Sequence, residues 1–275
     1  MERGFNNYYS IIQGGTGKTT TTANLGFGLA KLGKKVLLVD ADPQGDLTVC
    51  LGWQDTDSLP ITLASHLNGI MRDEPIPPTD GILHHQEGID LIPANIELSD
   101  LELSLVTAMS RESTLRRYLN QVKQSYDYVL IDCMPSLGMI TVNALAAADS
   151  VIVPVQAQYL PAKGMTQLMK TISRIRRHIN PQLKVDGILL TLADMRTNLA
   201  KQTADILRQS YEGVVKIYRS QIPMAVKAAE ISTVGKSIYA YDKGSKVAQA
   251  YLDFSREVLS NGEKQRAKHP PSPSR

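Results

Sequence analysis

The stretch GGTGKTTTT, residues 14–22, sets three glycines before a lysine and a run of threonines. Backbone N–H groups converge on phosphate oxygens where glycine leaves no Cβ in the way, and the N-terminus of a following helix adds a favourable dipole. A lysine at position 18 suits the β- and γ-phosphates of a nucleotide, and a threonine hydroxyl at position 19 suits Mg²⁺. These residue types favour a phosphate site over a glycine-rich turn with an incidental lysine.

Two further segments place carboxylates after apolar runs. VLLVDADPQGD carries Asp40 and Asp42, and YVLIDCMPSLG carries Asp132. The carboxyl end of a buried strand is where ligands bind in open α/β sheets, and an Asp there can hold Mg²⁺ and its water beside a phosphate loop. One such Asp could equally cap the next helix. Two of them together with the glycine-rich loop indicate a nucleotide site.

The loop departs from the standard pattern G-x-x-x-x-G-K-[ST]. Counting back from Gly17 and Lys18, that pattern requires glycine at position 12, and the sequence has Ile12. The lysine and threonines are therefore kept while the glycines are moved.

Short β-branched apolar runs predict the strands that position these groups. Because the runs lack polar alternation, they are typical of strands covered on both faces of a parallel sheet. Helical segments lie between them, which predicts a single α/β domain: one doubly wound, mostly parallel sheet with helices on both faces, like a P-loop NTPase. The predicted strands are 34–40, 126–132, 149–155 and 183–192. The predicted helices are 18–32, 61–71, 97–122, 137–147, 162–179, 197–210 and 244–260.

Length and composition agree with one soluble domain. The chain has 275 residues, of which 43% are hydrophobic and 21% are charged, and it has no apolar run long enough for a spanning helix. We expect one α/β domain over residues 1–260 and a disordered basic Pro/Ser-rich tail over 261–275. The two cysteines have no metal-ligand spacing, and the start of the chain lacks a signal peptide's apolar region, so we expect a cytoplasmic protein.

The motifs GGTGKTTTTANLG, VLLVDADPQGDLT and YDYVLIDCMPSLGMITVNALAAADSVIVPVQAQY, in this order, resemble the ParA/Soj family of partition ATPases, within the ParA/MinD group with a deviant Walker A loop. The likeness continues through LADMRTNLAKQTADIL and AYDKGSKVAQAYLDFSREVL, and covers roughly residues 8 to 260. It therefore extends over nearly the whole chain.

The resemblance implies ATP and Mg²⁺ as cofactors and assigns a role to several residues. Lys18 would bind phosphate and act in catalysis, Asp40 would orient the attacking water, and Asp132 would hold Mg²⁺ through water together with the Thr19 hydroxyl. The implied nucleotide-binding set is Gly14, Gly15, Thr16, Gly17, Lys18, Thr19 and Thr20. ATP would sandwich two subunits into a homodimer that binds double-stranded DNA non-specifically at the nucleoid, and a ParB-type centromere-binding protein would stimulate hydrolysis and release the DNA.

One position departs from the family's pattern. The signature lysine that precedes the first glycine, and that reaches the partner subunit's phosphates, is replaced by Gln13. Either Gln13 substitutes for the lysine, or residues are deleted and Gln13 is the family's preceding glutamine. We expect ATP and Mg²⁺ to bind while dimer-linked hydrolysis is weakened.

DNA contacts are expected in the C-terminal half. By the resemblance, Arg196 matches a family arginine that contacts DNA, and Lys227 keeps one of the two positive charges of a second segment, where Met224 replaces an arginine. The cationic stretch KTISRIRRH, residues 170–178, and the basic tail could compensate for the lost charge.

Two other functions are compatible with the same fold. A MinD-like membrane-cycling ATPase would end in an amphipathic helix, whereas EKQRAKHPPSPSR has no apolar face. A small-molecule synthetase of the dethiobiotin type would need an acceptor pocket, and the sequence shows no recognisable one. Stimulation of ATP turnover by DNA or by a small acceptor distinguishes the functions.

Overall fold

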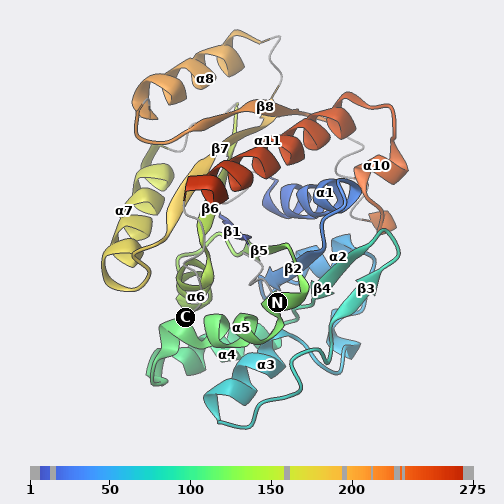
Figure 1. The fold of residues 1–275 in the computed structure, drawn as a ribbon, viewed down its shortest axis with the longest axis vertical. Helices are drawn as coiled ribbons and strands as arrows, with labels where there is room; N and C mark the ends of the chain where they lie inside the picture. Colours follow the sequence, from blue (N-terminus) through green and yellow to red (C-terminus); the bar gives the residue numbers. More distant parts are fainter. Residues whose placement is uncertain are drawn as a thin grey trace.

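The computed structural model describes residues 7–12, 17–157, 162–193, 197–211, 213–225, 230 and 233–268. Its centre is an eight-stranded sheet in the order β3-β4-β2-β5-β1-β6-β7-β8 (Figure 1). Neighbouring strands pair in parallel, except that β3 is antiparallel to β4 at one edge. The strands are β1 (Asn7–Ile11), β2 (Val36–Ala41), β3 (Leu83–His85), β4 (Ile89–Ile92), β5 (Tyr128–Cys133), β6 (Ser150–Gln156), β7 (Lys184–Ala193) and β8 (Ile217–Pro223).

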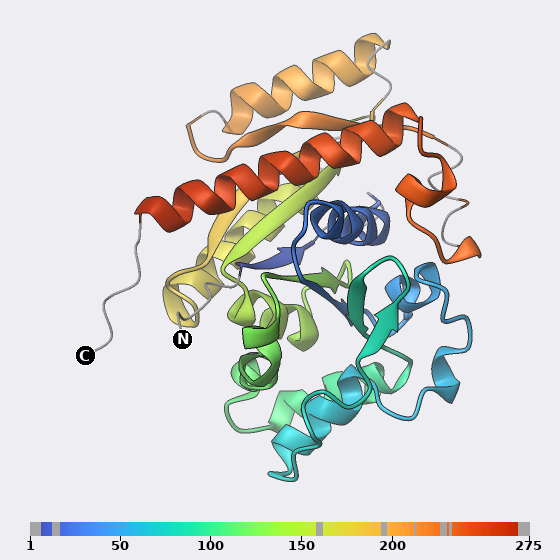
Figure 2. The same cartoon turned by 45° about the vertical axis from the view of Figure 1, so that its right-hand side comes forward.

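Helices cover both faces of the sheet, as predicted. One apolar core lies between the sheet and α1, α2, α10 and α11, and the other between the sheet and α3 to α8 (Figures 1 and 2). No helix in the described part of the chain combines the length and the apolar composition of a bilayer-crossing segment. The α-helices are α1 (Lys18–Lys31), α2 (Asp46–Cys50), α3 (Leu63–Met71), α4 (Glu97–Thr107), α5 (Thr114–Val122), α6 (Met139–Ala147), α7 (Ala162–His178), α8 (Asn198–Tyr211), α10 (Ile238–Tyr241) and α11 (Lys246–Lys268). Short 3₁₀ helices are η1 (Thr56–Ser58), η2 (Arg111–Ser113) and η3 (Lys123–Ser125).

The four predicted strands are confirmed as β2, β5, β6 and β7. Every residue of β2 and β5 is buried, because helices cover both faces of these central strands. This burial explains their unbroken apolar runs. The carboxyl ends of β2, β5 and β1 lie side by side and form the edge at which the site is built.

The single helix predicted over residues 97–122 is wrong. The structure has two helices, α4 and α5, separated by a turn in which Ser110 adopts a left-handed backbone with φ of 51°. Buried leucines recur at helical spacing on both sides of this turn, so the hydrophobic pattern runs through it without a visible break.

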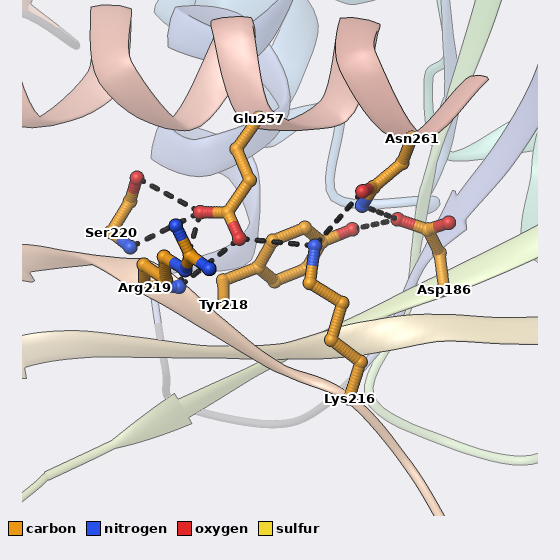
Figure 3. A network of polar contacts seen from close by, with 7 residues as sticks. All are labelled: Asp186, Lys216, Tyr218, Arg219, Ser220, Glu257 and Asn261. Carbon is orange, nitrogen blue, oxygen red and sulfur yellow. Dashed lines mark hydrogen bonds and ion pairs between the residues drawn. The ribbon is translucent and has the colours of Figure 1, made fainter. Parts of the chain in front are cut away.

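Glu257 joins α11 to the edge of the sheet (Figure 3). Its carboxylate accepts hydrogen bonds from the backbone N–H groups of Arg219 and Ser220, at 3.1 and 3.2 Å, and pairs with Lys216 at 3.0 Å. Burial would raise the pKa of Glu257, but these donors outweigh it and lower the pKa below its usual value. The carboxylate therefore stays charged and holds the C-terminal half of α11 on β8.

The predicted end of the last helix at residue 260 is also wrong, because α11 continues to Lys268. The side chain of Asn261 donates to Asp186 of β7 at 3.2 Å and accepts from Lys216 at 2.9 Å (Figure 3). The following residues, EKQRAK, are good helix formers, so the helix persists without an apolar face. Residues 261–268 of the predicted disordered tail are therefore helical, and residues 269–275 lie outside the described part of the chain.

Candidate functional site

The two predicted carboxylates meet at the carboxyl edge of the sheet. Asp40 at the end of β2 lies opposite Asp132 of β5 in the parallel register, and Asp132 lies opposite Ile11 at the end of β1. Since paired residues on neighbouring strands share a face of the sheet, both carboxylates point to the same side. β1 leads into the glycine-rich motif, whose described residues begin at Gly17, so the described parts of all three motifs lie at this edge.

A cavity of about 560 Å³ lies at this edge. It is wide enough for a nucleotide, since ligand pockets span roughly 300–1,000 Å³. Residues from four segments of the chain enclose it, which means that the fold and not one motif creates the pocket. Its described lining is Gly17, Lys18, Thr19, Thr20, Asp42, Pro43, Gln44, Asp46, Ser99, Met134, Pro135 and Ser136.

The N-terminus of α1 opens directly into this cavity. Gly17 is its N-cap residue with φ of 72°, a left-handed conformation that L side chains rarely adopt. Lys18, Thr19 and Thr20, which were predicted to bind the nucleotide, form the first turn of the helix and line the cavity. The first turn of a helix leaves backbone N–H groups unpaired, so these groups can donate hydrogen bonds to phosphate oxygens. The other predicted loop residues, Gln13, Gly14, Gly15 and Thr16, lie outside the described residues.

Asp132 is buried below the cavity and is held by two threonines. The Thr19 hydroxyl donates to one carboxylate oxygen at 2.7 Å, and the Thr22 hydroxyl donates to the other at 3.2 Å. Burial raises the pKa of Asp132 to about 6, although Lys18 and both hydroxyls hold it down. Asp132 is therefore a carboxylate near neutral pH, one hydrogen bond away from the cavity wall.

Asp40 does not reach the cavity. Its side chain is fully buried, and one of its oxygens accepts from both the backbone N–H and the hydroxyl of Thr48, at 2.9 and 2.7 Å. Burial, together with the nearby charge of Asp132, raises the pKa of Asp40 to about 8. Because the Asp40 side chain is fully buried and is not among the described residues that line the cavity, the structure does not place it against an attacking water, and its predicted water-orienting role gains no support from the geometry.

Its raised pKa makes Asp40 a source of pH-dependent stability. The folded pKa lies above the usual carboxyl value, so the contribution is full below about pH 4 and is lost as the pH rises toward about 8. In EDTA, the midpoint of thermal unfolding of wild type is expected to fall more steeply from about pH 6 to pH 8.5 than that of Asp40→Asn. Parallel curves for the two proteins, measured by circular dichroism, would contradict a raised pKa at Asp40.

Asp42 is the carboxylate that the motif places at the cavity. It is half-buried on the cavity wall, and its Oδ1 accepts from the backbone N–H of Gln44 at 3.0 Å, which fixes the turn. The sequence offered Asp40 and Asp42 together, and only their burial separates them. Ser99 of α4 is a further lining residue, and no motif in the sequence marks it.

Arg196 and Lys227, the predicted DNA contacts, both lie outside the described residues. They remain predictions from the resemblance.

Comparisons with known proteins match most of the chain. The AAA domain family matches residues 9–185. The sporulation initiation inhibitor protein Soj of Bacillus subtilis is 43% identical over 254 residues, covering 91% of this chain and 96% of Soj. The chromosome partitioning protein ParA of Caulobacter vibrioides is 41% identical over 259 residues, covering 93% of this chain and 94% of ParA.

A solved structure shares the fold over nearly its full length. The crystal structure described as cobyrinic acid a,c-diamide synthase from Mycobacterium smegmatis, with bound ADP and magnesium, has a TM-score of 0.82 and 34% identity. The similarity covers 95% of this chain and 97% of that one. With these relatives and the site described above, the chain belongs to the ParA/Soj family of partition ATPases.

Proposed function

We propose that this protein is an ATP-dependent DNA partition protein whose cavity binds Mg-ATP and hydrolyses it to ADP and phosphate. One observation carries the proposal: Lys18, Thr19 and Asp42 line a single cavity, and Asp132 is bonded to Thr19 beside it. A cation, a hydroxyl, a water-orienting carboxylate and a buried carboxylate are the groups that nucleotide hydrolysis requires. The relatives named as partition proteins match over nearly all of the chain, which supports the biological role.

The residues present suit Mg²⁺. The Thr19 hydroxyl and the Asp132 carboxylate supply neighbouring hard oxygen ligands, and we assign the first as a direct ligand and the second as a ligand through water. Within the described ranges, no three His, Cys, Asp or Glu side chains gather as a metal cage of their own. This agrees with Mg²⁺, which usually takes its remaining ligands from phosphates and water. When bound, it neutralises charge on the phosphates.

The chain's own groups would then do the following. The backbone N–H groups of residues 14–18 and the Lys18 side chain bind the phosphate oxygens, while Thr20 lies near the α-phosphate. Asp42 accepts a hydrogen bond from the attacking water and so orients it toward the terminal phosphate. Asp40 supports this arrangement from behind, since an N–H of Asp42 donates to it at 3.3 Å.

Exposed apolar residues beside the cavity support an ATP-dependent homodimer. Ile96, Leu103, Val106 and Met109, on α4 and its flanking turns, have relative exposures of 55%, 73%, 51% and 94%. Ser99 of the same helix lines the cavity, so this apolar surface begins beside the proposed nucleotide site. Such a patch is costly in water, and burying it against a second copy over the bound ATP would relieve that cost. A lysine in place of Gln13 is expected to raise turnover by strengthening this dimer.

Helix α7 offers a surface for duplex DNA. A ParB-type partner would stimulate ATP hydrolysis, and hydrolysis would release the DNA from this surface. Its sequence has five cations and no acidic residue. Lys170, Arg174 and Arg177 are exposed on one face, because residues four and three apart stack along a helix. Lys170 and Arg174 also line a groove of about 390 Å³ with Tyr211 of α8. This surface does not depend on Arg196 and Lys227, and it would place the protein on the nucleoid in the cytoplasm.

The triple variant Lys170→Gln/Arg174→Gln/Arg177→Gln is expected to weaken binding to random-sequence duplex DNA about tenfold or more in the presence of ATP. Its salt dependence should also be shallower, since fewer counterions are released. Fluorescence anisotropy across a salt series measures both. The control Lys31→Gln/Lys35→Gln removes two exposed cations, at the end of α1 and in the turn that follows it, while α1 packs on the opposite face of the sheet from α7. Equal affinity of the triple variant and the control would refute this surface.

A small-molecule synthetase remains a second candidate because a structural neighbour is described as an amide synthase. ATP turnover of the purified protein distinguishes the two functions. Turnover that rises with duplex DNA and a ParB-type partner supports partition. Turnover that requires a small carboxylate acceptor, and is unchanged by DNA, supports a synthetase instead.

A further inference from the structure

The N-terminus of α6 ends one wall of the cavity. Met134, Pro135 and Ser136 line the cavity just before this helix begins. Its N-cap residue is Gly138, which has no side chain to cap the helix, and its first turn contains no acidic residue. The exposed N–H groups of a helix N-terminus need acceptors, so this end depends on a group from elsewhere.

Glu102 of α4 supplies that group. Its Oε1 accepts from the backbone N–H of Met139 at 2.8 Å, which places a carboxylate at the positive end of α6. The same oxygen packs so closely on Gly138 that a Cβ at position 138 would overlap it. Glycine at this position therefore leaves space for the Glu102 carboxylate, which caps α6 although it belongs to another helix.

The cap connects two walls of the cavity. Ser99, which lies three residues before Glu102 on α4, itself lines the cavity. The segment between Ser136 and α6 is further tied by the Thr141 hydroxyl, which donates to the Ser136 carbonyl at 2.7 Å. Fixing Met139 thus fixes the end of the lining segment that begins at Met134.

Resting on the proposed ATP site, we infer that Glu102 is a positioning residue for ATP hydrolysis, which holds segment Met134–Gly138 against the nucleotide. Phosphoryl transfer depends on placement more than on covalent chemistry, and a wall displaced by about 1 Å can cost up to 10²-fold in rate. Glu102 has no contact with the cavity of its own among the described lining, so it acts through the loop.

Two variants remove the contact from opposite sides. Glu102→Ala deletes the carboxylate, and Gly138→Ala pushes it away while leaving Glu102 in the chain. Each is expected to raise the KM for Mg-ATP at least about fivefold, at a temperature well below its unfolding midpoint. Because both substitutions break the same contact, the double variant should have a KM for Mg-ATP no higher than that of the more impaired single variant. Glu102→Gln keeps an acceptor oxygen and should restore most of the loss.

Asp100→Ala is the matched control, since Asp100 is an exposed carboxylate on the same helix. Lower unfolding midpoints with an unchanged KM in Glu102→Ala and Gly138→Ala would overturn the inference, because they would show that Glu102 merely stabilises α6. The dissociation constant of a fluorescent ATP analogue, measured for each variant, provides a readout besides turnover. If wild type binds this analogue but hydrolyses no ATP, the proposed function fails, and a weakened affinity in both variants still supports the positioning of segment Met134–Gly138 by Glu102.

Discussion

Asp42→Asn is expected to lower the kcat for ATP hydrolysis about 10²-fold or more while changing nucleotide affinity less than about threefold. The carboxylate of Asp42 lies on the cavity wall, where it can accept a hydrogen bond from water. Asparagine keeps the oxygen that accepts from Gln44, so the turn is preserved, but it loses the charge that orients and polarises the water. A phosphate-release assay and a titration with a fluorescent ATP analogue measure the two quantities.

Asp46 provides the control for this prediction, because it is a second carboxylate on the same cavity wall. Asp46→Asn should retain most of the wild-type turnover, since its charge has no assigned role. Asp40→Asn should also retain more turnover than Asp42→Asn. Full activity of Asp42→Asn, or a larger loss with Asp40→Asn, would return the water-orienting role to Asp40.

Lys18→Gln is expected to weaken ATP binding about 10²-fold and to abolish measurable turnover. The side chain lies at the cavity in the first turn of α1, where it would form charge-assisted hydrogen bonds to phosphate oxygens. It also lowers the pKa of Asp132, so its removal shifts that carboxyl toward the protonated form and weakens the magnesium site. Two effects therefore act in the same direction.

Isothermal titration calorimetry with Mg-ATP measures the loss. Lys31→Gln, at the opposite end of the same helix and exposed to solvent, is the matched control and should bind as wild type does. Tight ATP binding by Lys18→Gln would mean that the cavity does not hold the phosphates in the proposed way.

The sequence predicts the central strands and most helices because buried strands and amphipathic helices have clear hydrophobic patterns. β2 and β5 are covered on both faces, so they appear as unbroken apolar runs. β8 lies at an edge and reads as IYRSQIP, in which three consecutive polar residues interrupt the apolar run and hide the strand pattern. β4 has only four residues, too few for a clear period.

The sequence predicts the site residues that belong to a motif. It does not predict those that only tertiary packing places at the site. The spacing of Gly17, Lys18 and Thr19 marks phosphate chemistry, and the structure places all three at the cavity. Asp40 and Asp42 are two residues apart in one motif, and only burial decides which one faces the cavity. Glu102 acts through a contact with α6, 37 residues further along the chain, for which local sequence gives no signal.

In the proposed function, ATP switches DNA binding on. The most direct test measures binding of the purified protein to random-sequence duplex DNA without nucleotide, with ADP, and with ATP plus Mg²⁺, across a salt series. Tight binding that requires ATP and weakens steeply with salt is the predicted result. Equal binding in all three states, or none in any of them while ATP is bound, would contradict the account.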